Sequence, residues 1–173
     1  VEILVVIAKA VDVRNVTAHG RRALAIVADS DITLRGTFSV SAVGGVPGPG
    51  GSSVLDPACT ASVASLGTNG SGGAGGGGFG TAGGRGGNGG DSQGGQGGAV
   101  AGNAQLVPLR GGCPGAYAYG VQSGGYGGRP GGALQLSTRG AIVLEAAAKL
   151  AASGGGARGP VECAPICPTC TVE

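Results

Sequence analysis

Large apolar residues alternate with small or polar residues in three short stretches near the amino-terminal end of the chain. Large apolar side chains occupy every second position of these stretches, at Leu24 and Ile26, Ile32 and Leu34, and Phe38 and Val40. A period of two places such side chains on one face of a β-strand. Turn-type residues such as Asp29-Ser30 separate the stretches. We therefore predict three short strands within Ala23–Gly45.

The same pattern returns much later in the chain, in Ala133–Gly155. A gapless alignment of the two segments matches Ala23 with Ala133, Leu24 with Leu134, Ile32 with Ile142, Leu34 with Leu144, Val40 with Leu150 and Ala42 with Ala152. Short strands joined by tight turns suit a right-handed parallel β-solenoid, in which each coil stacks on the next. We expect Val11–Thr17 to belong to an earlier coil.

One segment of the second copy has a competing interpretation. Leu144–Leu150 is rich in helix-forming residues, and Glu145 and Lys149 have the spacing of a helical ion pair. Because tertiary context overrides propensity, the repeat favours strand here, with a helix as the alternative.

Between the two copies, residues 67–132 contain runs in which two glycines precede one larger residue. This three-residue period matches the three residues per turn of polyproline II, so each run predicts a rod with bare faces that neighbouring rods can approach closely. Arg85, Asn88 and Asp91 then share one side of a rod, and Asp91-Ser92-Gln93 turns the chain back. We predict a bundle of antiparallel rods. A flexible or disordered glycine linker is the alternative, whereas collagen requires a different density of Gly and Pro.

Composition, charge and hydropathy exclude several further classes of protein. Gly supplies 42 and Pro 9 of the 173 residues, and Trp and Met are absent, which speaks against a single large core. The formal net charge of +2 and an aromatic content of 3% give no support for nucleic-acid binding. No apolar run is long enough for a membrane-spanning helix.

Five cysteines carry the remaining chemistry. Cys59 and Cys113 flank much of the glycine-rich segment. A disulfide between them would offset the entropy cost of ordering many glycines and indicates an oxidising compartment. Two unrelated buried thiols are the alternative.

The other three cysteines, Cys163, Cys167 and Cys170, stand close together near the last residue of the sequence. Their spacing occurs at iron–sulfur clusters, but the surrounding barrel fold is missing. A zinc knuckle lacks a fourth ligand, since His19 is remote in sequence. We interpret the three as unassigned cysteines at the start of a disulfide-rich module, with no metal or cofactor.

Four segments taken in order resemble one known group of proteins. They are VTAHGRRALAIVADSDITLRGTFSVSA, GGGGFGTAGGRGGNGG, GNAQLVPLRGGCPG and GGALQLSTRGAIVLEAAAKLAASGGG. The sequence is similar to the long glycine-rich, β-helix-like surface proteins of myxobacteria and related bacteria. The resemblance implies secretion and a structural or adhesive role, and it carries no catalytic residues. The cysteine tail departs from it.

No residue pattern predicts catalysis. His19 is the only histidine and has no nucleophile motif beside it. Asp29 and Asp31 form a polar turn, or alternatively the paired carboxylates of a carbohydrate-cleaving β-helix. We predict a non-catalytic extracellular structural or adhesion module. A carbohydrate-binding or carbohydrate-cleaving β-helix protein and an ice-binding protein are the alternatives.

The expected organisation has four parts. Residues 1–58 form β-solenoid coils, 59–132 the glycine-rich insert, 133–156 a second coil, and 157–173 a cysteine-containing linker or truncated module. The sequence begins within an apolar run, so we expect a fragment whose signal peptide lies outside it. Expected partners are neighbouring domains, further copies of the chain, or an extracellular polysaccharide.

Overall fold

The fold is mainly β, as a computed structural model of the chain shows, and the structure describes residues 2–52, 56–66, 68, 71–118 and 124–157. These residues contain no helix, and hence no helix that could cross a lipid bilayer. The strands are β1 (Ile3–Ala8), β2 (Val11–Val13), β3 (Val16–Thr17), β4 (Ala23–Ala28), β5 (Ile32–Leu34), β6 (Thr37–Ser39), β7 (Leu134–Thr138), β8 (Ile142–Leu144) and β9 (Lys149–Ala151).

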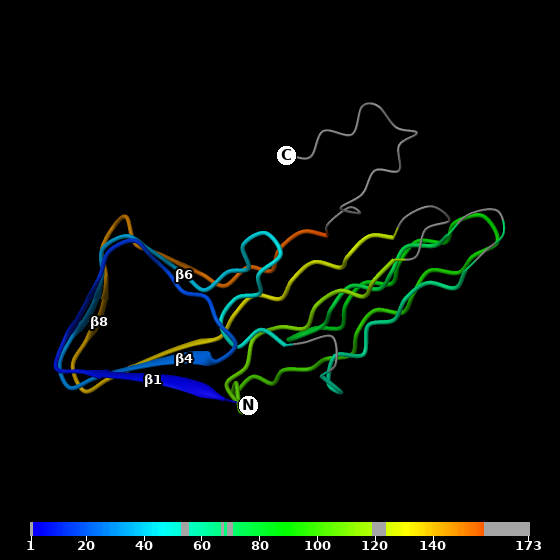
Figure 1. Cartoon of the computed structure of the whole chain (residues 1–173). Helices are drawn as coiled ribbons and strands as arrows, with labels where there is room; N and C mark the ends of the chain where they lie inside the picture. Colours follow the sequence, from blue (N-terminus) through cyan, green and yellow to red (C-terminus); the bar gives the residue numbers. More distant parts are fainter. Residues whose placement is uncertain (1, 53–55, 67, 69–70, 119–123, 158–173) are drawn as a thin grey trace.

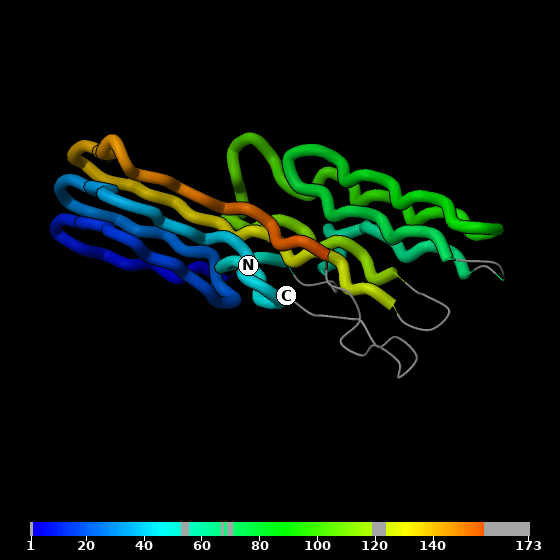
Figure 2. Tube along the Cα trace, turned by 90° about the horizontal axis from the view of Figure 1, so that it is seen from above, coloured from blue at the N-terminus to red at the C-terminus, as the bar shows by residue number. Residues whose placement is uncertain are grey.

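The strands form three parallel sheets with the orders β1-β4-β7, β2-β5-β8 and β3-β6-β9. Because consecutive strands enter different sheets, each turn of the chain contributes one strand to every sheet. Three such turns lie on one another, with β1–β3 in the first, β4–β6 in the second and β7–β9 in the third. Figure 1 shows the triangular outline of this stack, and Figure 2 shows its three layers from above.

The apolar core lies inside the stack, where the period-two pattern of the sequence placed it. Leu24, Ile26, Ile32, Leu34, Phe38 and Val40 are all buried and form one cluster with Val13 and Ala28. Each side chain of this size contributes about 1.5–3 kcal/mol when removed from water. The middle turn is the best buried because it has a neighbouring turn on both sides.

The structure corrects the third strand of the sequence alignment. Leu24 pairs with Leu134, and Leu34 pairs with Leu144, as aligned. Phe38, however, pairs with Leu150, which the gapless alignment had matched to Val40. The corner between β8 and β9 is longer than the one between β5 and β6, so the register shifts there.

This corner also decides between strand and helix in Leu144–Leu150. The segment contains the end of β8, a turn and the start of β9. Glu145 does not pair with Lys149 but forms an ion pair with Arg35 of the preceding turn. The helix alternative is therefore wrong, and the strand prediction holds only at the two ends of the segment, because residues 145–148 form the corner between β8 and β9.

Arg35 connects all three turns of the stack. Its Nε lies 2.9 Å from Asp12 Oδ2 in the first turn, and its Nη1 contacts Glu145 in the third. The hydrogen bond to Asp12, together with the charges of Asp12 and Glu145, raises the pKa of the Arg35 guanidinium above its ordinary value. The partners are exposed, so these pairs align the turns more than they stabilise them.

The glycine-rich segments between β6 and β7 are joined laterally by backbone hydrogen bonds, one at every third residue. Gly73 and Gly76 donate to the carbonyls of Gly87 and Gly84, at 2.8 and 2.9 Å. In the same way, Gly83 N donates to the carbonyl of Gly98, and Gly86 N donates to that of Gly95. Gly95 N in turn donates to the carbonyl of Gly73, and Gly98 N donates to that of Gly76. Three segments thus bond to one another in pairs, and Figures 1 and 2 show them beside the strands.

These segments approach one another where a side chain has no room. A β-carbon at Gly75 would lie within 3 Å of the Gln96 carbonyl, and one at Gly86 within 3 Å of the Gly73 carbonyl. At Gly84 and Gly87, by contrast, a β-carbon would meet no atom within 4 Å. In the pairs Gly83-Gly84 and Gly86-Gly87, the first glycine therefore packs against a neighbouring segment and the second faces open space.

The larger residues of the same run bond to adjacent segments. Asn88 Oδ1 accepts a hydrogen bond from Gly94 N at 2.9 Å, and Asp91 Oδ2 accepts one from Thr68 Oγ1 at 2.7 Å. Gly89 and Ser92 exchange backbone hydrogen bonds of 3.0 and 2.8 Å. The chain therefore reverses at Gly90-Asp91, close to the turn expected at Asp91-Ser92-Gln93.

Candidate functional site

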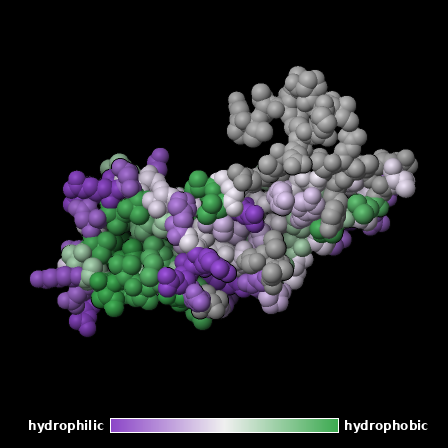
Figure 3. Space-filling view, viewed as in Figure 1, coloured by the Kyte–Doolittle hydropathy of each residue, from purple (hydrophilic) through white to green (hydrophobic). Residues whose placement is uncertain are grey.

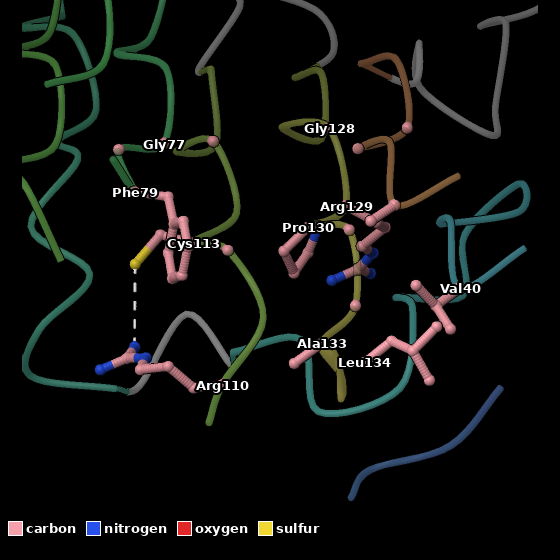
Figure 4. Close-up of a pocket in the computed structure, with 18 of the residues that line it drawn as sticks. Val40, Gly77, Phe79, Arg110, Cys113, Gly128, Arg129, Pro130, Ala133 and Leu134 are labelled. Carbon is pink, nitrogen blue, oxygen red and sulfur yellow. Dashed lines mark hydrogen bonds between the residues drawn. The ribbon is translucent and has the colours of Figure 1, made fainter. Parts of the chain in front are cut away.

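A cavity lies where the strands meet the glycine-rich segments. Its volume is about 670 Å³. Leu134 and Leu150 come from the third turn of the stack, Phe79 and Leu109 come from the glycine-rich side, and glycine backbone covers much of the remaining wall. Figure 4 shows this cavity with Phe79 and Leu134 on different walls. Its size is in the range of small-molecule sites.

Leu109 seals the boundary between the cavity and the outer face of sheet β1-β4-β7. It is buried against Ala23, Ala25 and Ala133. The small residues of this sheet face leave space for one leucine, while the inner face carries leucine and isoleucine. The large side chains of β4 therefore pack inside the stack, and its small side chains pack against Leu109 on the outer face of the sheet.

Among the described residues that line the cavity, the only charged ones are the arginines Arg110 and Arg129. Arg110 is already compensated, since its Nη2 lies 2.9 Å from Asp56 Oδ2 and 2.7 Å from Ser52 Oγ. Arg129 makes no side-chain hydrogen bond or ion pair with the described part of the chain. Figure 4 shows its guanidinium directed into the cavity, between Pro130 and Leu134.

Arg110 also lies against the disulfide. Cys59 and Cys113, the two cysteines paired from the sequence, are bonded at an S–S distance of 2.06 Å. Nη2 of Arg110 lies 3.8 Å from Cys59 Sγ and 4.0 Å from Cys113 Sγ. The Nε of Arg110 is buried and has no hydrogen-bond partner in the residues that the structure describes. An unsatisfied buried donor of this kind costs about 1–3 kcal/mol.

The candidate carboxylates of the sequence have structural partners. Asp29 Oδ1 lies 3.2 Å from Arg139 Nη1, and Asp31 Oδ1 accepts a hydrogen bond of 2.9 Å from the backbone N of Ala141. Both interactions join the second turn to the third. His19 is exposed in the loop between β3 and β4. The structure does not bring these three residues together with the cavity.

Within the described ranges no three His, Cys, Asp or Glu side chains gather as a metal site would require. Cys163, Cys167 and Cys170 lie outside the described residues.

No sequence pattern indicates Arg129, Phe79 or Leu109 as site residues. Their immediate neighbours are glycine, proline or arginine, and only the packing of distant segments brings the three to one cavity.

Comparison with known proteins does not assign the chain to a family: no family model, curated protein or solved structure matches it.

Proposed function

We propose that this chain is a non-catalytic structural or adhesion module of a secreted or cell-surface protein. Its architecture is a short parallel β-solenoid with an insert of polyproline-II-like rods. The spacing of three residues between successive lateral hydrogen bonds supports the rods, because polyproline II has three residues per turn. The stacking of one strand per sheet in every turn supports the solenoid.

The observation that carries the proposal is how the polar side chains are used. Asp12, Asp29, Asp31 and Glu145 all bond from one turn of the stack to another. Asp56 bonds to Arg110 beside the disulfide. Acidic side chains that are engaged in this way align neighbouring turns of the stack, and a catalytic role would require one of them to be released.

An extracellular location is part of the proposal and is supported by the disulfide, because such bonds persist in oxidising compartments. Immunolabelling of the source cells tests it. Antibodies raised against the purified chain should label intact cells, and labelling confined to permeabilised cells would reject the surface role. Incubation with pectin and alginate completes the test, since release of cleaved polysaccharide would show that the module is catalytic.

Carbohydrate binding is a second candidate function, favoured by one aromatic pair. Tyr117 and Tyr126 form an edge-to-face contact with ring centroids 5.3 Å apart, and both line a cavity of about 410 Å³. Tyr126 is 49% exposed, so its ring is accessible to a sugar. A substitution Tyr126→Ala should abolish retention on an immobilised polysaccharide if this function is present, and retention unaffected by the substitution would count against it.

A further inference from the structure

We propose that the cavity between the third turn of the stack and the glycine-rich segments binds a small organic carboxylate with an apolar body. This activity is separate from the structural role, and neither proposal depends on the other. The inference rests on the shape of the cavity, on the composition of its walls and on the charge of Arg129.

The walls suit an apolar body. Leu150 is 53% exposed and Leu106 is 47% exposed although both line the cavity, so apolar surface there is left uncovered by the chain itself. Burial of such surface contributes about 25 cal/mol per Å². Phe79 adds an aromatic wall, and its ring stands close over the backbone of Gly102, which has no side chain to displace it.

The charge selects an anion. No described residue that lines the cavity is acidic, and Asp56 neutralises only Arg110. Among the residues that the structure describes, Arg129 therefore has no acidic partner, and its guanidinium lies next to an apolar wall. A guanidinium binds a carboxylate through two parallel hydrogen bonds, which are stronger than hydrogen bonds between neutral groups. In a carboxylate with an apolar chain, the chain would pack against the apolar wall and the carboxylate would pair with Arg129.

Octanoate is the probe, and octanol is the matched uncharged probe. We expect the full chain to bind octanoate in equilibrium dialysis and to bind octanol at least about tenfold more weakly, as loss of a charge-assisted pair predicts. Equal binding of octanol would overturn the proposal, because the cavity would then be merely apolar. Binding of galacturonate in place of octanoate would also overturn it and would support carbohydrate recognition instead.

Two substitutions locate the site. Arg129→Ala should weaken octanoate binding about tenfold or more, and Arg129→Lys should fall between it and the original chain because the charge remains without the planar fork. Gly112→Leu should abolish binding by filling the cavity, since a β-carbon at Gly112 meets only Pro130 Cβ, at 3.8 Å.

Matched controls exclude unfolding and general charge effects. Arg14→Ala removes an arginine whose side chain is 77% exposed on the first turn, far along the chain from the cavity. Gly87→Leu adds the same side chain as Gly112→Leu at an open glycine that does not line the cavity. Both should bind octanoate like the original chain. Circular dichroism confirms folding of every variant, and undiminished binding by folded Arg129→Ala or Gly112→Leu would overturn the assignment.

Discussion

Leu24 of β4 is the direct parallel partner of Leu134 of β7, although residues 25–133 lie between them in the sequence. The chain leaves the stack and returns to it at one corner. Gly132 N donates to Val40 O, and Ala133 N donates to Pro49 O, both at 2.8 Å. The departing and returning segments are thus hydrogen-bonded to each other, so the long insertion leaves the sheets uninterrupted.

The disulfide should stabilise the glycine-rich segments most. Cys59 and Cys113 are 54 residues apart, and a crosslink over this span restricts the unfolded chain by roughly 4 kcal/mol in the chain-entropy account. We expect the double substitution Cys59→Ser, Cys113→Ser to lower the free energy of unfolding by about 2–4 kcal/mol. Urea unfolding followed by circular dichroism measures the loss.

Amide hydrogen exchange separates the two parts of the molecule in the same variant. The amides of Gly73, Gly86 and Gly95 should lose protection, while those of β4 keep it. Reducing agent added to the double variant is the control and should change nothing further at these amides. Glycine amides that exchange at random-coil rates in the disulfide-bonded chain would contradict the bundle itself.

Two glycines provide a matched test of close packing. Gly75→Ala places a methyl group against the Gln96 carbonyl and should destabilise the chain by about 1–3 kcal/mol. Gly87→Ala meets open space and should leave stability unchanged or raise it by up to about 1 kcal/mol, because alanine restricts the unfolded chain. Thermal unfolding of both variants decides, and equal destabilisation would mean that Gly75 is not in a packed position.

The strands could be predicted because large apolar side chains occupy every second position along them. This alternation can be recognised within one strand, without knowing which distant residues pack against it. Ile32 and Leu34 illustrate this, since both are buried as expected. The register of β9 was not predictable, because the corner after β8 sets it. The cavity could not be predicted from the sequence for a related reason. Arg129 and Leu109 have glycine, proline or polar neighbours, and glycine runs have no side chains that could encode which segments meet.

Phe38 should be the most sensitive core position. Its side chain is 1% exposed, and it pairs with Val16 on one side and Leu150 on the other. Phe38→Ala removes a large buried ring between two turns and should cost about 3–5 kcal/mol of stability. Chemical denaturation measures this loss.

Arg35→Ala is the contrasting change at the same stack. It removes the exposed contacts to Asp12 and Glu145, and salt screens such pairs. The expected loss is a small fraction of that for Phe38→Ala and should vanish at high ionic strength. A loss as large as that of Phe38→Ala would show that the charged column, rather than the core, holds the turns together.

The exposed edge of the stack should drive association between copies. β1 pairs with β4 on one side only in the described structure, and its residue Ile7 is 80% exposed. Figure 3 shows apolar side chains gathered on the face at the β1 end. An unpaired, apolar strand edge is a template for pairing with a further strand. We expect the sedimentation coefficient of the isolated chain to rise with concentration.

A charge on the edge should suppress this association. Val5 lies in β1 and is 51% exposed, whereas Val43 is equally exposed, at 53%, but lies in a turn away from the strands. Val5→Lys should keep the chain monomeric at concentrations where the original chain associates, because a lysine on an edge strand disfavours pairing. Val43→Lys adds the same charge and should associate like the original. If both variants are equally monomeric, net charge rather than the β1 edge controls the contact; if the original chain is itself monomeric throughout, the edge has no affinity for a second copy.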